Sequence, residues 1–140
     1  MRSKSFEGMA CSIATTLEAV GDRWAMLVLR DLMLGLSRYD DLRKSTDITN
    51  ATLTDRLRQL EQSGLVERRL YQSGPDRYEY LLTPKGRDLS LVIQALAQVG
   101  DRWRLQQEAQ PPMRFVRAQS GTPLRLALVE EESGRSVPFS

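Results

Sequence analysis

The sequence contains no histidine and a single cysteine, Cys11. The chain therefore cannot form an internal disulfide, and it lacks the residues of most metal sites and of every Ser-His-Asp or Cys-His catalytic arrangement. It also lacks the side chain that usually titrates near neutral pH. These absences argue against hydrolytic or metal-assisted catalysis, and we expect no enzymatic activity and no metal or other cofactor. Composition alone leaves Asp, Glu, Lys and Tyr chemistry open.

Long apolar runs are also absent. No stretch reaches the roughly 18 apolar residues that would span a bilayer. The first thirty residues carry Glu7, Glu18 and Asp22 among short apolar clusters, which is not the pattern of a secretory signal. A single cysteine is consistent with a reducing compartment. We therefore expect a cytoplasmic protein with no membrane partner.

The chain has the composition of one globular domain with a tail. It has 140 residues, of which 41% are hydrophobic and 27% charged. Its formal net charge is only +2, which is weak evidence for a nucleic-acid partner. The positive charge is nevertheless concentrated between residues 66 and 87, with Arg68, Arg69, Arg77, Lys85 and Arg87 set against Glu67, Asp76 and Glu79.

The order of predicted elements between residues 39 and 86 is the most informative feature. Helices are expected over 38–45, capped by Ser37, and over 50–62, capped by Thr49. Leu53, Leu57 and Leu60 lie at the spacing of one buried helix face. Strands are expected over 65–71 and 77–82, around a turn at 73–76. Two short helices followed by a hairpin are typical of a helix-turn-helix with a wing.

Further helices are expected on both sides of this segment. One runs over 12–20 with Ser12 as N-cap, and a second over 23–34. After the hairpin, a helix begins at Thr83-Pro84 and carries an apolar stripe over about five turns to Trp103. This stripe is too long to be used entirely inside one small domain.

The C-terminal region is predicted to differ in class. Pro111-Pro112 marks a boundary, so we expect a domain over 1–110 and an extension over 111–140. Short strands are expected at 115–117, 124–129 and 136–139, as a small hairpin or meander. The predicted fold is therefore mostly α with a β-hairpin wing (α+β), followed by a short β-rich tail.

Several side chains have the chemistry of a DNA interface. Asn50, Thr52 and Arg56 lie at the start of the second helix of the motif, where a recognition helix approaches base edges, and Thr49 caps that helix. The alternative is a solvated helix face, which the basic hairpin that follows disfavours.

Basic residues outside that helix are candidates for contacts to the DNA backbone. Arg77, just after the hairpin turn, could enter the minor groove or bind phosphate. Arg43 and Lys85 are further phosphate candidates. Taken singly, Arg43 and Lys85 are better explained as ordinary surface charges than as DNA contacts.

Several motifs in order resemble the HxlR-type winged-helix regulators, relatives of the MarR group. They are Cys11-Ser12-Ile13, Gly21-Asp22-Arg23-Trp24, Leu29-Arg30-Asp31-Leu32, Tyr39-Asp40-Asp41-Leu42, Leu53-Thr54-Asp55-Arg56-Leu57 and Tyr80-Leu81-Leu82-Thr83-Pro84-Lys85-Gly86. The resemblance spans roughly residues 9 to 105. It implies a homodimer on a pseudo-palindromic operator, with residues 50–56 near bases and Arg77 in the wing.

The same resemblance implies dimerisation through the first helix and the helix after the wing. This agrees with the surplus apolar stripe, and the predicted interface residues are Leu89, Val92, Ile93, Leu96 and Trp103. A dimer over an operator would block polymerase, which favours a repressor. The rival interpretation is a winged-helix module that binds another protein and has no specific DNA site.

Cys11 lies where many proteins of this type carry an N-terminal cysteine, which in some of them senses oxidants or electrophiles. A thiolate at a helix start is stabilised by unpaired backbone N–H groups. With no second cysteine, reversible oxidation would have to join two protomers or take up a small thiol. The alternative is a small apolar residue that packs beside Met9 and Ile13.

Overall fold

The computed structural model describes residues 4–104 and 113–139, and the chain divides into two units, residues 1–90 and 91–140. The predicted domain boundary between residues 110 and 111 lies outside the described residues. In this part of the chain, no helix is both long enough and apolar enough to cross a membrane.

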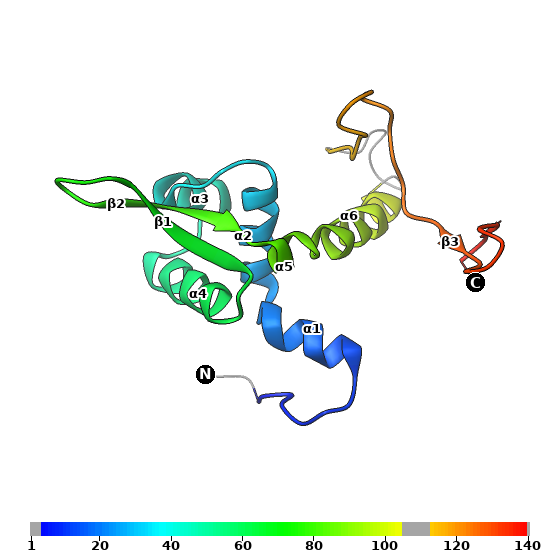
Figure 1. Ribbon diagram of the computed structural model, residues 1–140, viewed down its shortest axis with the longest axis horizontal. Coiled ribbons are helices and arrows are strands. Elements are labelled where there is room, and N and C mark those ends of the chain that lie inside the picture. Colours follow the sequence, from blue (N-terminus) through cyan, green and yellow to red (C-terminus); the bar gives the residue numbers. More distant parts are fainter. Residues whose placement is uncertain (1–3, 105–112, 140) are drawn as a thin grey trace. The chain divides into compact units, whose positions relative to one another are not determined.

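The first unit is a helix-turn-helix with a hairpin wing, which confirms the predicted fold class. Figure 1 shows the hairpin projecting from the helices of this unit. Its elements are α1 (Ser12–Val20), α2 (Arg23–Met33), α3 (Tyr39–Thr46), α4 (Asn50–Gln62), β1 (Val66–Gln72), β2 (Arg77–Leu82) and α5 (Pro84–Arg87).

The core of this unit lies around α2, which packs against α3, α4 and β2. The predicted inner face of α4 is confirmed, since Leu53, Leu57 and Leu60 are all buried. Val28 and Leu29 of α2 are fully buried as well. Burying a leucine or valine side chain contributes about 1.5–3 kcal/mol, so these residues fix the position of α4 on α2.

The helix caps agree with the prediction at one position and differ at two. The N-cap of α1 is Cys11 and not Ser12, which is the first residue of the helix. Thr49 caps α4, accepting a hydrogen bond from the N–H of Thr52. Ser37 does not cap α3, whose N-cap residue is Arg38 without a side-chain cap bond. The reason is that residues 37 and 38 pair with β2: the N–H of Tyr80 donates to the Ser37 carbonyl at 2.7 Å, and Arg38 forms a bridge with Glu79.

The single helix predicted after the hairpin is wrong, because the chain forms α5 and then α6 (Ser90–Arg104). Between them, the N–H groups of Asp88 and Leu89 donate to carbonyls three residues back, as in a 3₁₀ turn. This break accompanies a close approach at Gly86, where an added Cβ would lie 2.0 Å from the carbonyl oxygen of Leu65.

The second unit consists of α6 and the tail. The tail contains only β3 (Leu128–Val129), β4 (Ser136–Val137) and one bridge, Val116 to Pro123. These strands are shorter than predicted. The side-chain amide of Gln98 in α6 forms hydrogen bonds with both main-chain polar groups of Leu126. Its Nε2 donates to the carbonyl at 3.0 Å, and its Oε1 accepts from the N–H at 2.8 Å. Leu126 is therefore not free to extend a strand ladder.

The contact at Gly86 predicts a strong asymmetry between two glycines. Gly86→Ala should lower the free energy of unfolding by about 1–3 kcal/mol, because the new methyl group meets backbone that cannot rotate away. Gly100→Ala is the matched control: it lies in α6 with no atom within 4 Å of an added Cβ, so alanine should stabilise by about 0.5–1 kcal/mol. Urea denaturation of both variants measures the difference, and equal stabilities would contradict the close approach.

Candidate nucleic-acid interface

The start of α4 gathers three of the predicted DNA-binding side chains. Thr49 and Asn50 are exposed and Thr52 is half-buried. The Thr49 hydroxyl donates to Thr52 Oγ1 at 2.9 Å while it accepts from the Thr52 N–H. The result is a cluster of short polar side chains at a helix N-terminus, where unpaired backbone N–H groups favour anions such as phosphate.

Tyr39 of α3 orients Asn50. Its hydroxyl lies 3.0 Å from Asn50 Oδ1, 3.1 Å from the Asn50 carbonyl oxygen and 3.2 Å from Thr54 Oγ1. Asn50 Oδ1 keeps a second lone pair and its NH₂ group keeps its donors, so the amide remains able to pair with a base. The sequence analysis gave Tyr39 no role of its own beyond a place in a family motif. Its position one helix before a candidate base reader was the available signal.

Arg56 is held inside the first unit by Asp22 at the start of α2. Its Nε and a terminal nitrogen lie 2.8 Å and 2.6 Å from Asp22 Oδ2. Its other terminal nitrogen pairs with Asp55. The side chain of Arg56 is only 22% exposed and that of Asp22 34% exposed. In this geometry the guanidinium links α4 to α2, a role that the sequence did not suggest.

Electrostatics keep this pair charged at neutral pH. Burial would raise the pKa of Asp22, but hydrogen bonds from Arg56 and from the Ala25 N–H, together with the positive charge of Arg56, outweigh it and leave that pKa below its ordinary value. The same hydrogen bond raises the pKa of Arg56 despite partial burial. Asp22 therefore acts both as the N-cap of α2 and as a fixed counter-ion for α4.

Two arginines of the hairpin have partners within the first unit. The guanidinium of Arg68 lies over the ring of Tyr78, 4.3 Å from its centroid, and Arg69 pairs with Glu79 at 2.8 Å. Arg38, just before α3, lies over the ring of Tyr71 in β1, also 4.3 Å from the centroid. Arg77 is exposed at the first position of β2, opposite Gln72. It thus lies at the turn end of the hairpin, directly after the turn.

The two weaker phosphate candidates lie in different settings. Lys85 Nζ donates to the carbonyl of Ser63 at 2.8 Å, which satisfies a main-chain acceptor at the C-terminus of α4. Arg43 is exposed in the last turn of α3.

The remaining predicted residues lie at the start of α1, in the turn before α6 and on α6. Cys11 is the exposed N-cap residue of α1 and makes no side-chain cap bond. The predicted interface residues fall into two groups: Leu89 and Ile93 are buried, whereas Leu96 and Trp103 are exposed, with Val92 between.

The chain is similar to helix-turn-helix transcriptional regulators over most of its length. A model of the HxlR-like helix-turn-helix family matches residues 19–108. Rv3095 of Mycobacterium tuberculosis, an uncharacterised HTH-type transcriptional regulator, is 42% identical over 109 residues, which cover 78% of this chain and 68% of that protein.

Two solved structures extend the comparison. PA1374 of Pseudomonas aeruginosa, a proposed transcription factor, is 39% identical with a TM-score of 0.63, covering 92% of this chain and 87% of its own. The redox regulator HypR in its reduced form is 30% identical with a TM-score of 0.63, covering 71% of this chain and 100% of its own.

The pairing of Asp22 with Arg56 predicts a pH-dependent stability difference. Asp22→Asn keeps an N-cap acceptor but removes the charge, and should cost about 1 kcal/mol near neutral pH, since both groups are partly exposed. Because the folded state lowers the pKa of Asp22, this stabilisation is present above about pH 4 and is lost as the pH falls through the folded-state value.

Urea denaturation at several pH values between about 7 and 3 tests this expectation. The gap between wild type and Asp22→Asn should close at the acid end. Asp76→Asn, in the exposed hairpin turn, is the control and should leave stability unchanged. A gap that stays constant with pH would show that the charge of Asp22 is not what stabilises the fold.

Proposed function

The chain belongs to the HxlR-like helix-turn-helix family of transcriptional regulators, and from this we propose that it binds a specific DNA operator as a homodimer. The observation that carries the proposal is the polar cluster at the start of α4, formed by exposed Thr49 and Asn50 with half-buried Thr52, beside a hairpin with Arg77 at its turn end. The proposal assigns the chain no catalytic activity.

The chemistry of the interface residues supports separate roles in base reading, phosphate binding and positioning. Asn50, oriented by Tyr39, would read adenine through its amide, and the Thr52 methyl group would contact a thymine methyl. Arg77 would lie in the minor groove or on phosphate, with Arg43 as a further phosphate contact. Arg56 would act as a positioning residue, because its donors already bind Asp22 and Asp55.

Exposed apolar side chains support the dimer. Ile13 and Leu17 of α1 are exposed, as are Leu96 and Trp103 of α6. Exposed apolar groups of this size favour burial against a partner. Two copies would present two α4 helices to half-sites roughly 34–36 Å apart on a pseudo-palindromic operator. Such a dimer would act as a repressor by occupying the DNA that polymerase needs.

Two substitutions should separate base reading from phosphate binding. Asn50→Ala should weaken binding to the operator by about 1–3 kcal/mol while leaving scrambled DNA unaffected, because a base contact is lost. Arg77→Ala should weaken binding to both DNAs and lower the salt slope by about 1, because a phosphate contact is lost. Anisotropy titrations against the intergenic DNA beside its own gene, at two salt concentrations, measure both effects.

Leu34→Ala is a suitable control, since Leu34 is exposed at the C-terminus of α2. If neither Asn50→Ala nor Arg77→Ala changes binding, α4 and the hairpin are not the DNA interface. If the wild-type protein itself binds no DNA specifically, a winged-helix module that docks on another protein becomes the better interpretation.

We further propose that oxidants or electrophiles regulate this binding through Cys11. The exposed thiol lies at the N-cap of α1, so oxidation or alkylation of Cys11 would act at the start of a helix proposed for dimerisation. HypR, to which the chain is similar, is a redox regulator. Diamide could oxidise the Cys11 thiols of two protomers to one disulfide, with its azo group taking up the two electrons and two protons.

The sensing role predicts a cysteine-dependent response to diamide. Operator affinity should change at least roughly tenfold, about 1.4 kcal/mol, when wild-type protein is treated with diamide. Cys11→Ser should bind the operator like the untreated protein and should not respond. The same titrations measure this, with mass spectrometry to identify the oxidised species. A wild-type thiol left unmodified by excess diamide would refute the sensing role.

A further inference from the structure

The tail, residues 113–139, is ordered without a single buried side chain. Every residue in this range is exposed or half-buried. Its large exposed apolar side chains are Val116, Leu124, Leu128, Val129 and Phe139. In the described part of the second unit, residues 91–104 and 113–139, Ile93 is the only buried side chain.

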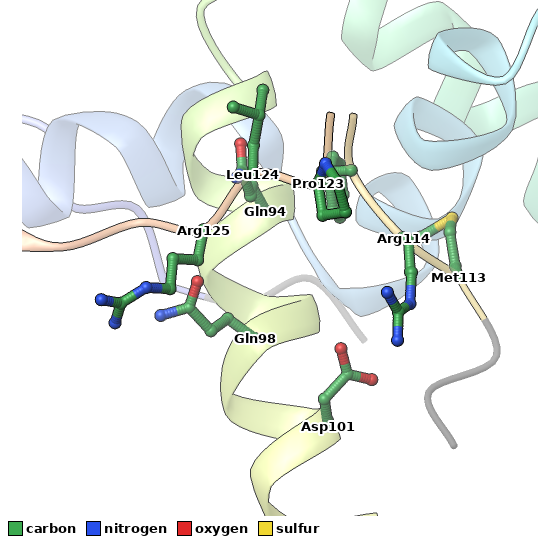
Figure 2. Close-up of a pocket in the computed structure, with 9 residues that line it drawn as sticks. Gln94, Gln98, Asp101, Met113, Arg114, Pro123, Leu124 and Arg125 are labelled. Atoms are coloured by element: carbon green, nitrogen blue, oxygen red, sulfur yellow. The ribbon is translucent and has the colours of Figure 1, made fainter. Parts of the chain in front are cut away.

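Local hydrogen bonds and one contact with α6 hold the tail in this conformation. Within the tail, the N–H of Arg117 donates to the Thr122 carbonyl at 2.8 Å, among several bonds of this kind. Two hydrogen bonds join the Gln98 amide to the main chain of Leu126. β3 and β4 pair over only two residues each. Figure 2 shows side chains from α6 and from the tail lining one hollow of about 190 Å³, polar on the side of α6 and mostly apolar on the side of the tail.

The tail leaves five of its large apolar side chains exposed within one copy. Fixing a residue's backbone costs roughly 1–2 kcal/mol, and an isolated two-stranded hairpin is marginal in water. Burial of apolar side chains normally offsets this cost, but among the tail's large apolar residues only Met113, Phe115, Leu126 and Val137 are half-buried, and none is fully buried. A partner that covers the exposed ones would stabilise this conformation of the tail.

The polarity of α6 shows why the tail cannot cover itself on its own helix. Gln94, Gln98 and Asp101 recur at helical spacing and face the tail (Figure 2). Leu96 and Trp103 lie roughly 160° away around the helix at 100° per residue, so they form the opposite face. The tail is thus held on the polar face of α6, and the exposed apolar face of that helix is out of its reach.

The charge of the tail indicates which kind of partner could cover its apolar side chains. Glu130, Glu131 and Glu132 form an exposed acidic run at the turn between β3 and β4. This run would repel DNA phosphates and an anionic membrane surface. A second copy of this chain instead offers exposed arginines, among them Arg117 and Arg125 of its own tail, and an isologous contact would use each complementary pair twice.

We propose that residues 113–139 form a dimer arm, in which Val116, Leu124, Leu128, Val129 and Phe139 pack against a second copy of the chain. This rests on the homodimer of the proposed function and adds to α1 and α6 an interface outside the family match at residues 19–108. The similarity to PA1374 covers 92% of this chain, which residues 19–108 alone cannot supply, so part of the tail has a counterpart there.

Sedimentation equilibrium of the full-length protein tests the arm. The double variant Leu128→Ser/Val129→Ser should raise the dimer dissociation constant at least roughly tenfold, because each substitution removes an apolar side chain from the interface. Leu70→Ser is the matched control: Leu70 is similarly exposed, at 47%, but lies in the hairpin wing. Its dissociation constant should match that of the wild type.

Cross-linking provides a second test that does not depend on affinity. Benzoylphenylalanine is placed at position 139, and equal amounts of ¹⁴N and ¹⁵N protein are unfolded together in urea and refolded, so that subunits exchange, before illumination. Cross-linked peptides that combine both isotopes should appear, because they can form only between copies. Exclusively single-isotope products would show that the tail contacts its own chain and would overturn the proposal.

The outcomes separate this proposal from the proposed function. A wild-type protein that is monomeric at micromolar concentration and binds no operator would refute both. A dimer that binds the operator but keeps its dissociation constant in Leu128→Ser/Val129→Ser would refute the arm alone.

Discussion

The carboxylate of Asp22 is the constraint on which the arrangement of the first unit depends. Its Oδ1 accepts the N–H of Ala25 and so starts α2, while its Oδ2 accepts two bonds from Arg56 of α4. One side chain therefore fixes both where α2 begins and how α4 is rotated about its axis. Leucines bury the inner face of α4, and the two donors that Arg56 places on Asp22 Oδ2 add a directional contact that apolar packing lacks. The orientation of the exposed polar cluster follows from this pair.

Hydrogen bonds attach the base of the wing to the helices of the first unit. The N–H of Tyr80 in β2 donates to the Ser37 carbonyl just before α3. Just after β2, the Thr83 hydroxyl donates to the Gly64 carbonyl and Lys85 Nζ donates to the Ser63 carbonyl, both at the end of α4. Because these bonds use main-chain acceptors, they hold the backbone itself. The candidate recognition helix and the wing are therefore one body, and their spacing is set before any DNA arrives.

Local patterns in the sequence predicted most of the first unit, since they report burial and turn chemistry. The 3.6-residue spacing of Leu53, Leu57 and Leu60 and the cap at Thr49 were sufficient to place α4. Contacts between elements distant in sequence were beyond such patterns. Ser37 does not cap α3, because its carbonyl accepts a hydrogen bond from β2. The helix expected after the wing is interrupted next to the close approach of Gly86 to Leu65. Arg56 looked available for DNA until the fold brought it to Asp22, 34 residues away.

In the proposed homodimer, dimer stability and operator affinity would not be independent. Two α4 helices on one operator would act as linked binding modules, because the dimer provides a high effective concentration at the second half-site. Any contact that strengthens such a dimer would also strengthen operator binding by linkage, wherever it lies. Under this proposal, the exposed apolar face of α6, the tail and Cys11 would all act on the same dimerisation equilibrium. Changes in parts of the chain that do not contact DNA would then change repression.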